Sequence, residues 1–151
     1  MRQLVTKGTR GTKGTRQIRG EIMNTVPHDG EILRLSNVVR RTSLEIHKYL
    51  RSGFTEKIYE NALAHRLRKR GIRVEQQECI RVFDEDGTLL GLFRTDILIE
   101  RILICEVKSC SALVDGHTAQ LLGYLRATGM QHGLLINFGG PKLEIRKYIL
   151  S

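Results

Sequence analysis

Residues 92–108 of the chain read LFRTDILIERILICEVK. Two apolar runs, at 97–99 and 102–104, are separated only by Glu100 and Arg101, and this pattern predicts two β-strands joined by a tight hairpin. Both runs are apolar at nearly every position, as expected for central strands that are covered on both faces. Covering both faces of a sheet requires helices on each side, so this stretch favours an α/β fold.

Charged side chains interrupt these apolar strands at Asp96, Glu106 and Lys108. Alternate residues of a strand share a face, so Glu106 and Lys108 point the same way while Val107 points into the core. A hairpin can set Asp96 beside Glu106, and two carboxylates with a backbone carbonyl form an oxygen-rich site suited to Mg²⁺ or Mn²⁺. Lys108 would then orient a water or neutralise phosphate charge. The alternative is a salt bridge buried within the sheet.

Outside this stretch, the hydrophobic periodicity predicts the remaining elements. Helices are expected at about 31–50, 55–70 and 115–128, and strands at 72–83, 89–99, 102–108, 133–138 and 143–150. The order is therefore α-α-β-β-β-α-β-β, a mixed central β-sheet flanked by helices. The helical residues expected to face the core include Leu35, Val38, Val39, Thr42, Ile46, Tyr49, Leu50, Ile58, Ala62, Leu63, Leu67, Ala119, Leu122 and Leu125. Glu60 is expected to be a solvated helix acid.

Residues 1–30 form a basic, low-complexity tail that contains the sequence TKGTR twice. Residues 1–20 supply +6 of the net charge of +9, and the tail lacks the apolar side chains that would offset the entropy of ordering. We expect it to be disordered. It is either an arm that binds nucleic acid or translated upstream sequence before a start at Met23. One folded domain is expected over residues 31–151.

Composition also limits the class of protein. Three cysteines, with no CxxC pair, make a disulfide framework or a zinc ribbon unlikely and fit a reducing cytoplasm. No apolar run is long enough to cross a bilayer, and no amphipathic anchor accompanies the tail, so a membrane partner is not expected. The positive charge favours a polyanionic partner such as nucleic acid. Sequence alone does not distinguish a monomer from a homodimer.

The motifs together resemble the PD-(D/E)XK nuclease superfamily and, within it, the GxxExxY group. The core signature corresponds to Asp96 followed by Glu106-Val107-Lys108, and the group motif to Gly53-Phe54-Thr55-Glu56-Lys57-Ile58-Tyr59. The triplet Arg94-Thr95-Asp96 and two later blocks, at 117–129 and 133–139, also resemble that group. The resemblance covers residues 32–150 and implies a restriction-endonuclease-like core.

The same resemblance implies roles for individual residues. The catalytic set would be Glu56, Asp96, Glu106 and Lys108, and the metal ligands would be Glu56, Asp96, Glu106 and the backbone carbonyl of Val107. Gln120 and Tyr124 are similar to the Gln-x-x-x-Tyr element of RecB-like nucleases, which contacts the substrate backbone. His117 and Arg94 are further candidates for substrate binding. Tyr59 is expected to be a packing residue.

The predicted activity is hydrolysis of a nucleic-acid phosphodiester by a water activated by Mg²⁺ or Mn²⁺. DNA is expected as the substrate rather than RNA on the resemblance alone. The alternative is a nuclease-fold module that binds nucleic acid or a protein without significant turnover.

Overall fold

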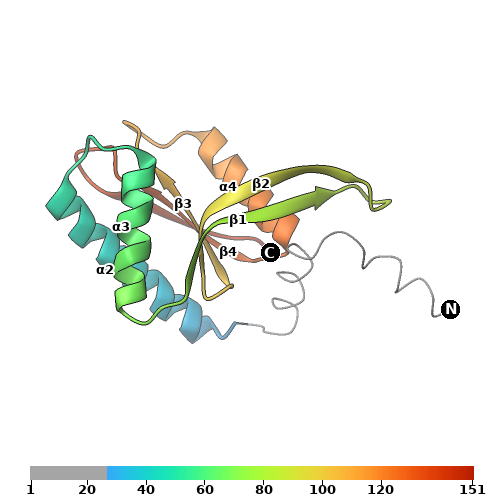
Figure 1. Cartoon of the computed structure of the whole chain (residues 1–151), viewed down its shortest axis with the longest axis horizontal. Helices are drawn as coiled ribbons and strands as arrows, with labels where there is room; N and C mark the ends of the chain where they lie inside the picture. Colours follow the sequence, from blue (N-terminus) through green and yellow to red (C-terminus); the bar gives the residue numbers. More distant parts are fainter. Residues whose placement is uncertain (1–26) are drawn as a thin grey trace.

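A computed structural model describes residues 27–151, which fold as three helices around one five-stranded sheet (Figure 1). The predicted tail falls almost entirely outside these residues. Among the described residues the first helix begins at Asp29, two residues before the predicted domain boundary. Among residues 27–151 no helix is long and apolar enough to cross a membrane.

The predicted α/β class and element order are confirmed. The sheet has the order β1-β2-β3-β4-β5, in which β3 and β4 are parallel and the other neighbours are antiparallel. The helices are α2 (Asp29–Leu50), α3 (Glu56–Lys69) and α4 (Asp115–Thr128). The strands are β1 (Val74–Phe83), β2 (Leu89–Ile99), β3 (Leu103–Lys108), β4 (His132–Asn137) and β5 (Glu144–Ile149).

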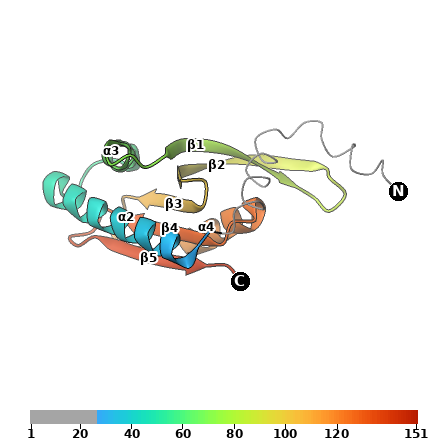
Figure 2. The ribbon, with the colours of Figure 1, turned by 90° about the horizontal axis from the view of Figure 1, so that it is seen from below.

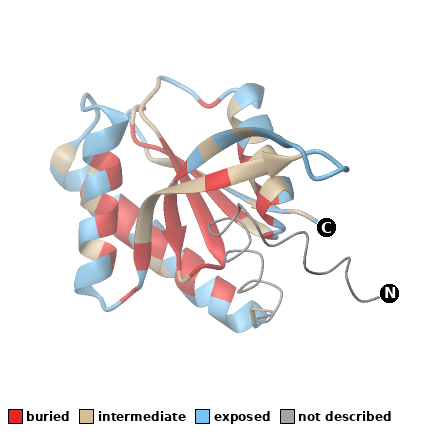
Figure 3. Ribbon diagram, turned by 45° about the vertical axis from the view of Figure 1, so that its right-hand side comes forward, coloured by how far each residue is buried: buried red, intermediate tan, exposed pale blue. Residues whose placement is uncertain are grey.

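Two apolar cores cover the two faces of the sheet (Figure 2). The larger core contains residues of α2 and α3, and β3 contributes Leu103, Cys105 and Val107 to it. The smaller core contains residues of α4, and β3 contributes Ile104. Because side chains alternate along a strand, Glu106 and Lys108 share the α4 face with Ile104. The central strands are accordingly buried throughout, whereas the tip of the β1–β2 hairpin is exposed (Figure 3).

The turn between β2 and β3 is the tight hairpin that the sequence predicts. Glu100 and Arg101 both have positive φ, 48° and 58°, and Ile102 N donates to Ile99 O at 3.0 Å to close the turn. Three residues, 100–102, lie between the register partners Ile99 and Leu103. The ladder that follows is short, with register partners Ile97↔Cys105, Leu98↔Ile104 and Ile99↔Leu103. The part of β2 that precedes residue 97 pairs with β1, and these two strands form a long projecting arm (Figure 1).

Some helix faces differ from the prediction. Ile58 is 42% exposed and Tyr49 is 77% exposed, and Ala119 is also exposed, although all three were expected to face inward. In α3 the buried face contains Leu63 and Leu67, as predicted, and Tyr59 in place of Ile58, at steps of four residues. Tertiary packing decides which face of α3 turns toward the core, since the Tyr59 ring stacks on Phe138 of the segment after β4, with ring centroids 4.7 Å apart.

The same packing reverses the prediction for Glu60, which is 2% exposed rather than solvated. It follows Tyr59 on the buried side of α3. Its carboxylate accepts hydrogen bonds from Lys57 Nζ and Gln76 Nε2, each at 2.7 Å, and from Gln77 Nε2. A buried carboxylate needs such partners, and here β1 supplies two of the three.

The end of β4 is hydrogen-bonded to the loop after β3. Asn137 Oδ1 accepts from Cys110 N at 3.1 Å and from Gly139 N at 3.0 Å, while Asn137 Nδ2 donates to Cys110 O at 2.9 Å. A Cβ at Gly139 would lie 2.3 Å from Cys110 N, so the two backbones touch. These contacts fix the chain two residues after Lys108.

We therefore expect Gly139→Ala to destabilise the protein by about 1–3 kcal/mol, the usual cost of overpacking, because backbone atoms must move to admit the methyl group. The measurement is urea unfolding followed by circular dichroism. Gly123→Ala, in α4 with no atom within 4 Å of the added Cβ, is the matched control and should be neutral or slightly stabilising. An unfolding midpoint for Gly139→Ala equal to that of the control would contradict this account.

Candidate metal centre and phosphodiester site

The site is built where β2 and β3 separate. After the Ile97↔Cys105 pair, the next opposed positions are Asp96 and Glu106, which are no longer register partners. Instead, Asp96 N donates to Glu106 Oε1 at 3.2 Å, and Val107 N donates to Asp96 Oδ2 at 2.8 Å. Each carboxylate thus accepts a backbone N–H of the opposite strand, so the two acids lie side by side.

Glu106 is 3% exposed, and this burial raises its pKa to about 9, with the neighbouring Asp96 carboxylate contributing further to the rise. Two carboxylates that share a buried space cannot both be ionised without a compensating cation. Oxygen ligands of this kind suit a hard divalent cation such as Mg²⁺ or Mn²⁺. The donor set and the raised pKa therefore both fit a metal at this position.

The backbone of Val107 adds a further oxygen on the same side. In an extended strand the N–H and C=O of one residue point toward the same neighbouring strand. Because Val107 N donates to Asp96, the Val107 carbonyl also points into the space between β2 and β3. The residue's side chain is meanwhile buried in the α2–α3 core, which fixes the backbone.

Lys108 is connected to α4 by a chain of hydrogen bonds. Lys108 Nζ donates to Gln120 Oε1 at 3.0 Å, and Gln120 Nε2 donates to Tyr124 Oη at 2.6 Å. The Tyr124 ring stacks on Phe93 of β2, with centroids 4.1 Å apart. Partial burial raises the pKa of Tyr124, and the negative charge of Glu106 raises it further. Lys108, Gln120 and Tyr124 thus form one polar row beside the acids.

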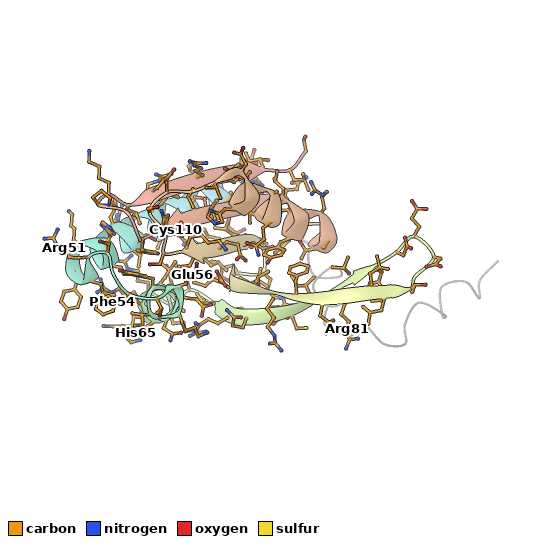
Figure 4. All side chains as sticks on the ribbon, turned by 90° about the horizontal axis from the view of Figure 1, so that it is seen from above. Arg51, Phe54, Glu56, His65, Arg81 and Cys110 are labelled. Carbon is orange, nitrogen blue, oxygen red and sulfur yellow. The ribbon has the colours of Figure 1, made fainter. Side chains whose placement is uncertain are left out.

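Glu56 is the first residue of α3 and the middle residue of the Gly53–Tyr59 motif. Gly53 has φ of 118°, a conformation that favours glycine, and Tyr59 Oη binds both Phe54 N and Arg51 O to close the loop. Ser109 Oγ donates to Phe54 O at 2.7 Å, so the start of α3 lies against the end of β3. Figure 4 shows Glu56 on the side of α3 that faces the sheet.

Glu56 is nevertheless exposed, and it is not gathered with the other two acids. Within residues 27–151 no three His, Cys, Asp or Glu side chains are grouped closely enough to hold a metal ion. The structure therefore brings together Asp96 and Glu106 and places Glu56 at the rim. Its side chain would have to turn toward the pair to become a third ligand.

Two other candidates are engaged in local contacts. His117 Nδ1 accepts from Val114 N at 3.1 Å at the start of α4, which leaves Nε2 for any other contact. Arg94 Nη1 donates to Gln77 O at 3.1 Å on the neighbouring strand. The hydrogen bonds of these two side chains go to Val114 and Gln77, so their substrate roles stay predictions.

Sequence reasoning missed two residues next to the site, Glu60 and Gln77. Gln77 Nε2 donates to Glu60 Oε1 and lies 3.4 Å from Asp96 Oδ1. The available signal was an acid one helical turn after Glu56 and a polar Gln-Gln pair within the strand that precedes Asp96. Neither pattern is specific enough to indicate a buried contact between α3 and β1.

The comparisons with known proteins agree with this geometry. A family model described as "PD-(D/E)XK nuclease superfamily" matches residues 34–148. The solved structure titled "Crystal structure of SSO0001" is similar with a TM-score of 0.53 and 16% identity, over 91% of this chain and 77% of that one. At that identity the likeness shows the fold alone. No curated protein matches the chain.

The raised pKa of Glu106 predicts how stability depends on pH when chelator removes divalent cations. In the unfolded chain this carboxyl loses its proton near pH 4.5, whereas in the fold it does so near pH 9. Between these values the folded state binds the extra proton. The free energy of unfolding should therefore fall as pH rises, by at most about 1.4 kcal/mol per pH unit.

The measurement is thermal or urea unfolding from pH 5 to pH 9 in EDTA, for wild type and for Glu106→Gln. The glutamine resembles the protonated acid, and its stability should change much less over this range. Parallel pH profiles for the two proteins would show that Glu106 ionises normally in the fold.

Proposed function

The chain belongs to the PD-(D/E)XK nuclease superfamily, and from this we propose that it is a metal-dependent nuclease that hydrolyses phosphodiester bonds of nucleic acid. The observation that carries the proposal is the paired arrangement of Asp96 and Glu106, each bound to the backbone of the other's strand. Such a pair orients two carboxylates toward one point, as a divalent ion requires.

The proposed ligands are Asp96, Glu106 and the Val107 carbonyl, with Glu56 as a third carboxylate from the start of α3. When bound, Mg²⁺ or Mn²⁺ supplies Lewis-acid stabilisation of phosphate charge and lowers the pKa of a nearby water. Binding would require Glu106 to release its proton, so affinity for the cation should increase with pH up to about 9.

Lys108 acts on the substrate side of the acids. It shares the α4 face of β3 with Glu106, and Gln120 Oε1 accepts one of its three N–H groups. The remaining N–H groups can hold the attacking water and stabilise negative charge that develops on the phosphate. Gln120 and Tyr124 would place the substrate backbone, and Arg94 and His117 are proposed to contact it farther out.

Membership of the GxxExxY group is part of the proposal. It is supported by the way in which the motif residues act together, since Gly53 permits the turn, Tyr59 closes it and Glu56 then begins the helix. We further propose DNA as the substrate and the cytoplasm as the location. The basic tail (residues 1–30) is proposed as a separate segment from the domain at 31–151.

Lys108→Ala should reduce cleavage by a factor of about 100 to 1000, because a charged group aimed at the transition state is removed. Mn²⁺ binding and the unfolding midpoint should change little. The measurement is initial cleavage rate on a labelled substrate in Mg²⁺ and in Mn²⁺, and Lys147→Ala on the edge strand β5 is the control. Equal rates for Lys108→Ala and wild type would exclude this mechanism.

A panel of single-stranded, duplex, flapped and branched DNA, with matched RNAs, tests the substrate class. Asp96→Asn serves as the inactive control, since the amide oxygen can still accept from Val107 N while the charge is lost. Cleavage of one DNA form by wild type alone supports the proposal. Tight binding of nucleic acid without any cleavage would identify a binding module instead.

A further inference from the structure

Gln77 occupies an unusual backbone position beside the metal centre. It lies between the register pairs Gln76↔Ile97 and Glu78↔Thr95, which places it opposite Asp96. Its φ is 56°, in the left-handed region that a residue with a side chain rarely adopts within a strand. Such a conformation costs on the order of 1 kcal/mol or more and persists only when surrounding contacts hold it. Arg94 Nη1 provides one such contact by donating to the Gln77 carbonyl.

The side chain of Gln77 links two carboxylates on different elements. Its Nε2 donates to Glu60 Oε1 of α3 and lies 3.4 Å from Asp96 Oδ1 of β2. A carboxamide nitrogen carries two hydrogens, so one group can serve both acids. The left-handed backbone departs from the regular alternation of the strand, which explains how adjacent residues Gln76 and Gln77 both reach Glu60.

Glu60 is the fixed end of this link. Its carboxylate is buried and has two further donors, Lys57 Nζ and Gln76 Nε2. It cannot turn away without leaving these groups unpaired. Asp96 Oδ2 is already held by Val107 N. A donor at Oδ1 therefore fixes both oxygens of Asp96 and, with them, the plane of the carboxylate.

We propose that Gln77, anchored by Glu60, is a positioning residue that orients Asp96 for binding of the divalent cation. The inference rests on the proposed function, because it concerns the same metal centre. Outer contacts that hold a ligand commonly change metal affinity by a factor of about 10–100 when they are removed. Gln77 contacts Asp96 rather than substrate, so its loss should act mainly through the metal.

The test is Mn²⁺ binding to the full-length protein, measured by calorimetry and by the electron paramagnetic resonance signal of free Mn²⁺. Gln77→Ala removes the link, and Gln77→Asn keeps an amide that tolerates a left-handed backbone but is one methylene too short to reach both acids. Both variants should bind Mn²⁺ about tenfold or more weakly than wild type. In cleavage assays, high Mn²⁺ should restore most of the lost rate.

Asn61→Ala is the control, because the Asn61 side chain joins the same cluster only through Gln76 Nε2, outside the contacts that hold Glu60 and Asp96. Its Mn²⁺ affinity should stay within about twofold of wild type. Wild-type affinity in a folded Gln77→Asn protein would overturn the inference and leave the nuclease proposal intact. Absence of Mn²⁺ binding by wild type would overturn both the inference and the nuclease proposal. Equal Mn²⁺ affinity of wild type and Asp96→Asn would do the same.

Discussion

The separation of β2 from β3 after Ile97 and Cys105 is the constraint on which the site depends. A central strand pair that stops early leaves backbone N–H groups without strand partners, and buried N–H groups must be satisfied. Here Asp96 and Glu106 satisfy them, each with its own carboxylate. The same two side chains that complete the sheet are therefore the side chains that gather negative charge at one point.

This arrangement accumulates more negative charge than the fold can accommodate by itself. Glu106 is buried beside Asp96, so its pKa is raised to about 9. Below about pH 9 Glu106 therefore keeps its proton, and apolar cores on both faces of the sheet hold the strands in place. A bound cation would take the place of that proton, and in this sense the stability of the sheet and affinity for metal are coupled. Lys108 lies nearby, but its ammonium is hydrogen-bonded toward α4.

The strands and their charged residues could be predicted because the relevant signals are local. Period-two alternation places Glu106 and Lys108 on one face. The predicted hairpin brings the strand of Asp96 beside that of Glu106, but the register that opposes the two acids was not predicted, because it requires three residues, 100–102, between the partners Ile99 and Leu103. Gln120 and Tyr124 were expected near the site from their resemblance to the Gln-x-x-x-Tyr element. In the structure Gln120 contacts Lys108, and Tyr124 contacts Gln120. By contrast, Glu60 was placed in solvent, because four-residue spacing identifies neighbours on a helix and not the direction in which that face points.

By itself, the sequence determined the element order, the tight turn at Glu100-Arg101 and the shared face of Glu106 and Lys108. Each of these follows from spacing along the chain. Only the tertiary structure decided which face of α3 is buried, that Glu56 stands at the rim while Glu60 is enclosed, and that Gln77 joins Glu60 to Asp96. The two contacts of Gln77 join residues 17 and 19 positions apart in sequence, and no local periodicity specifies how a helix rotates against a sheet.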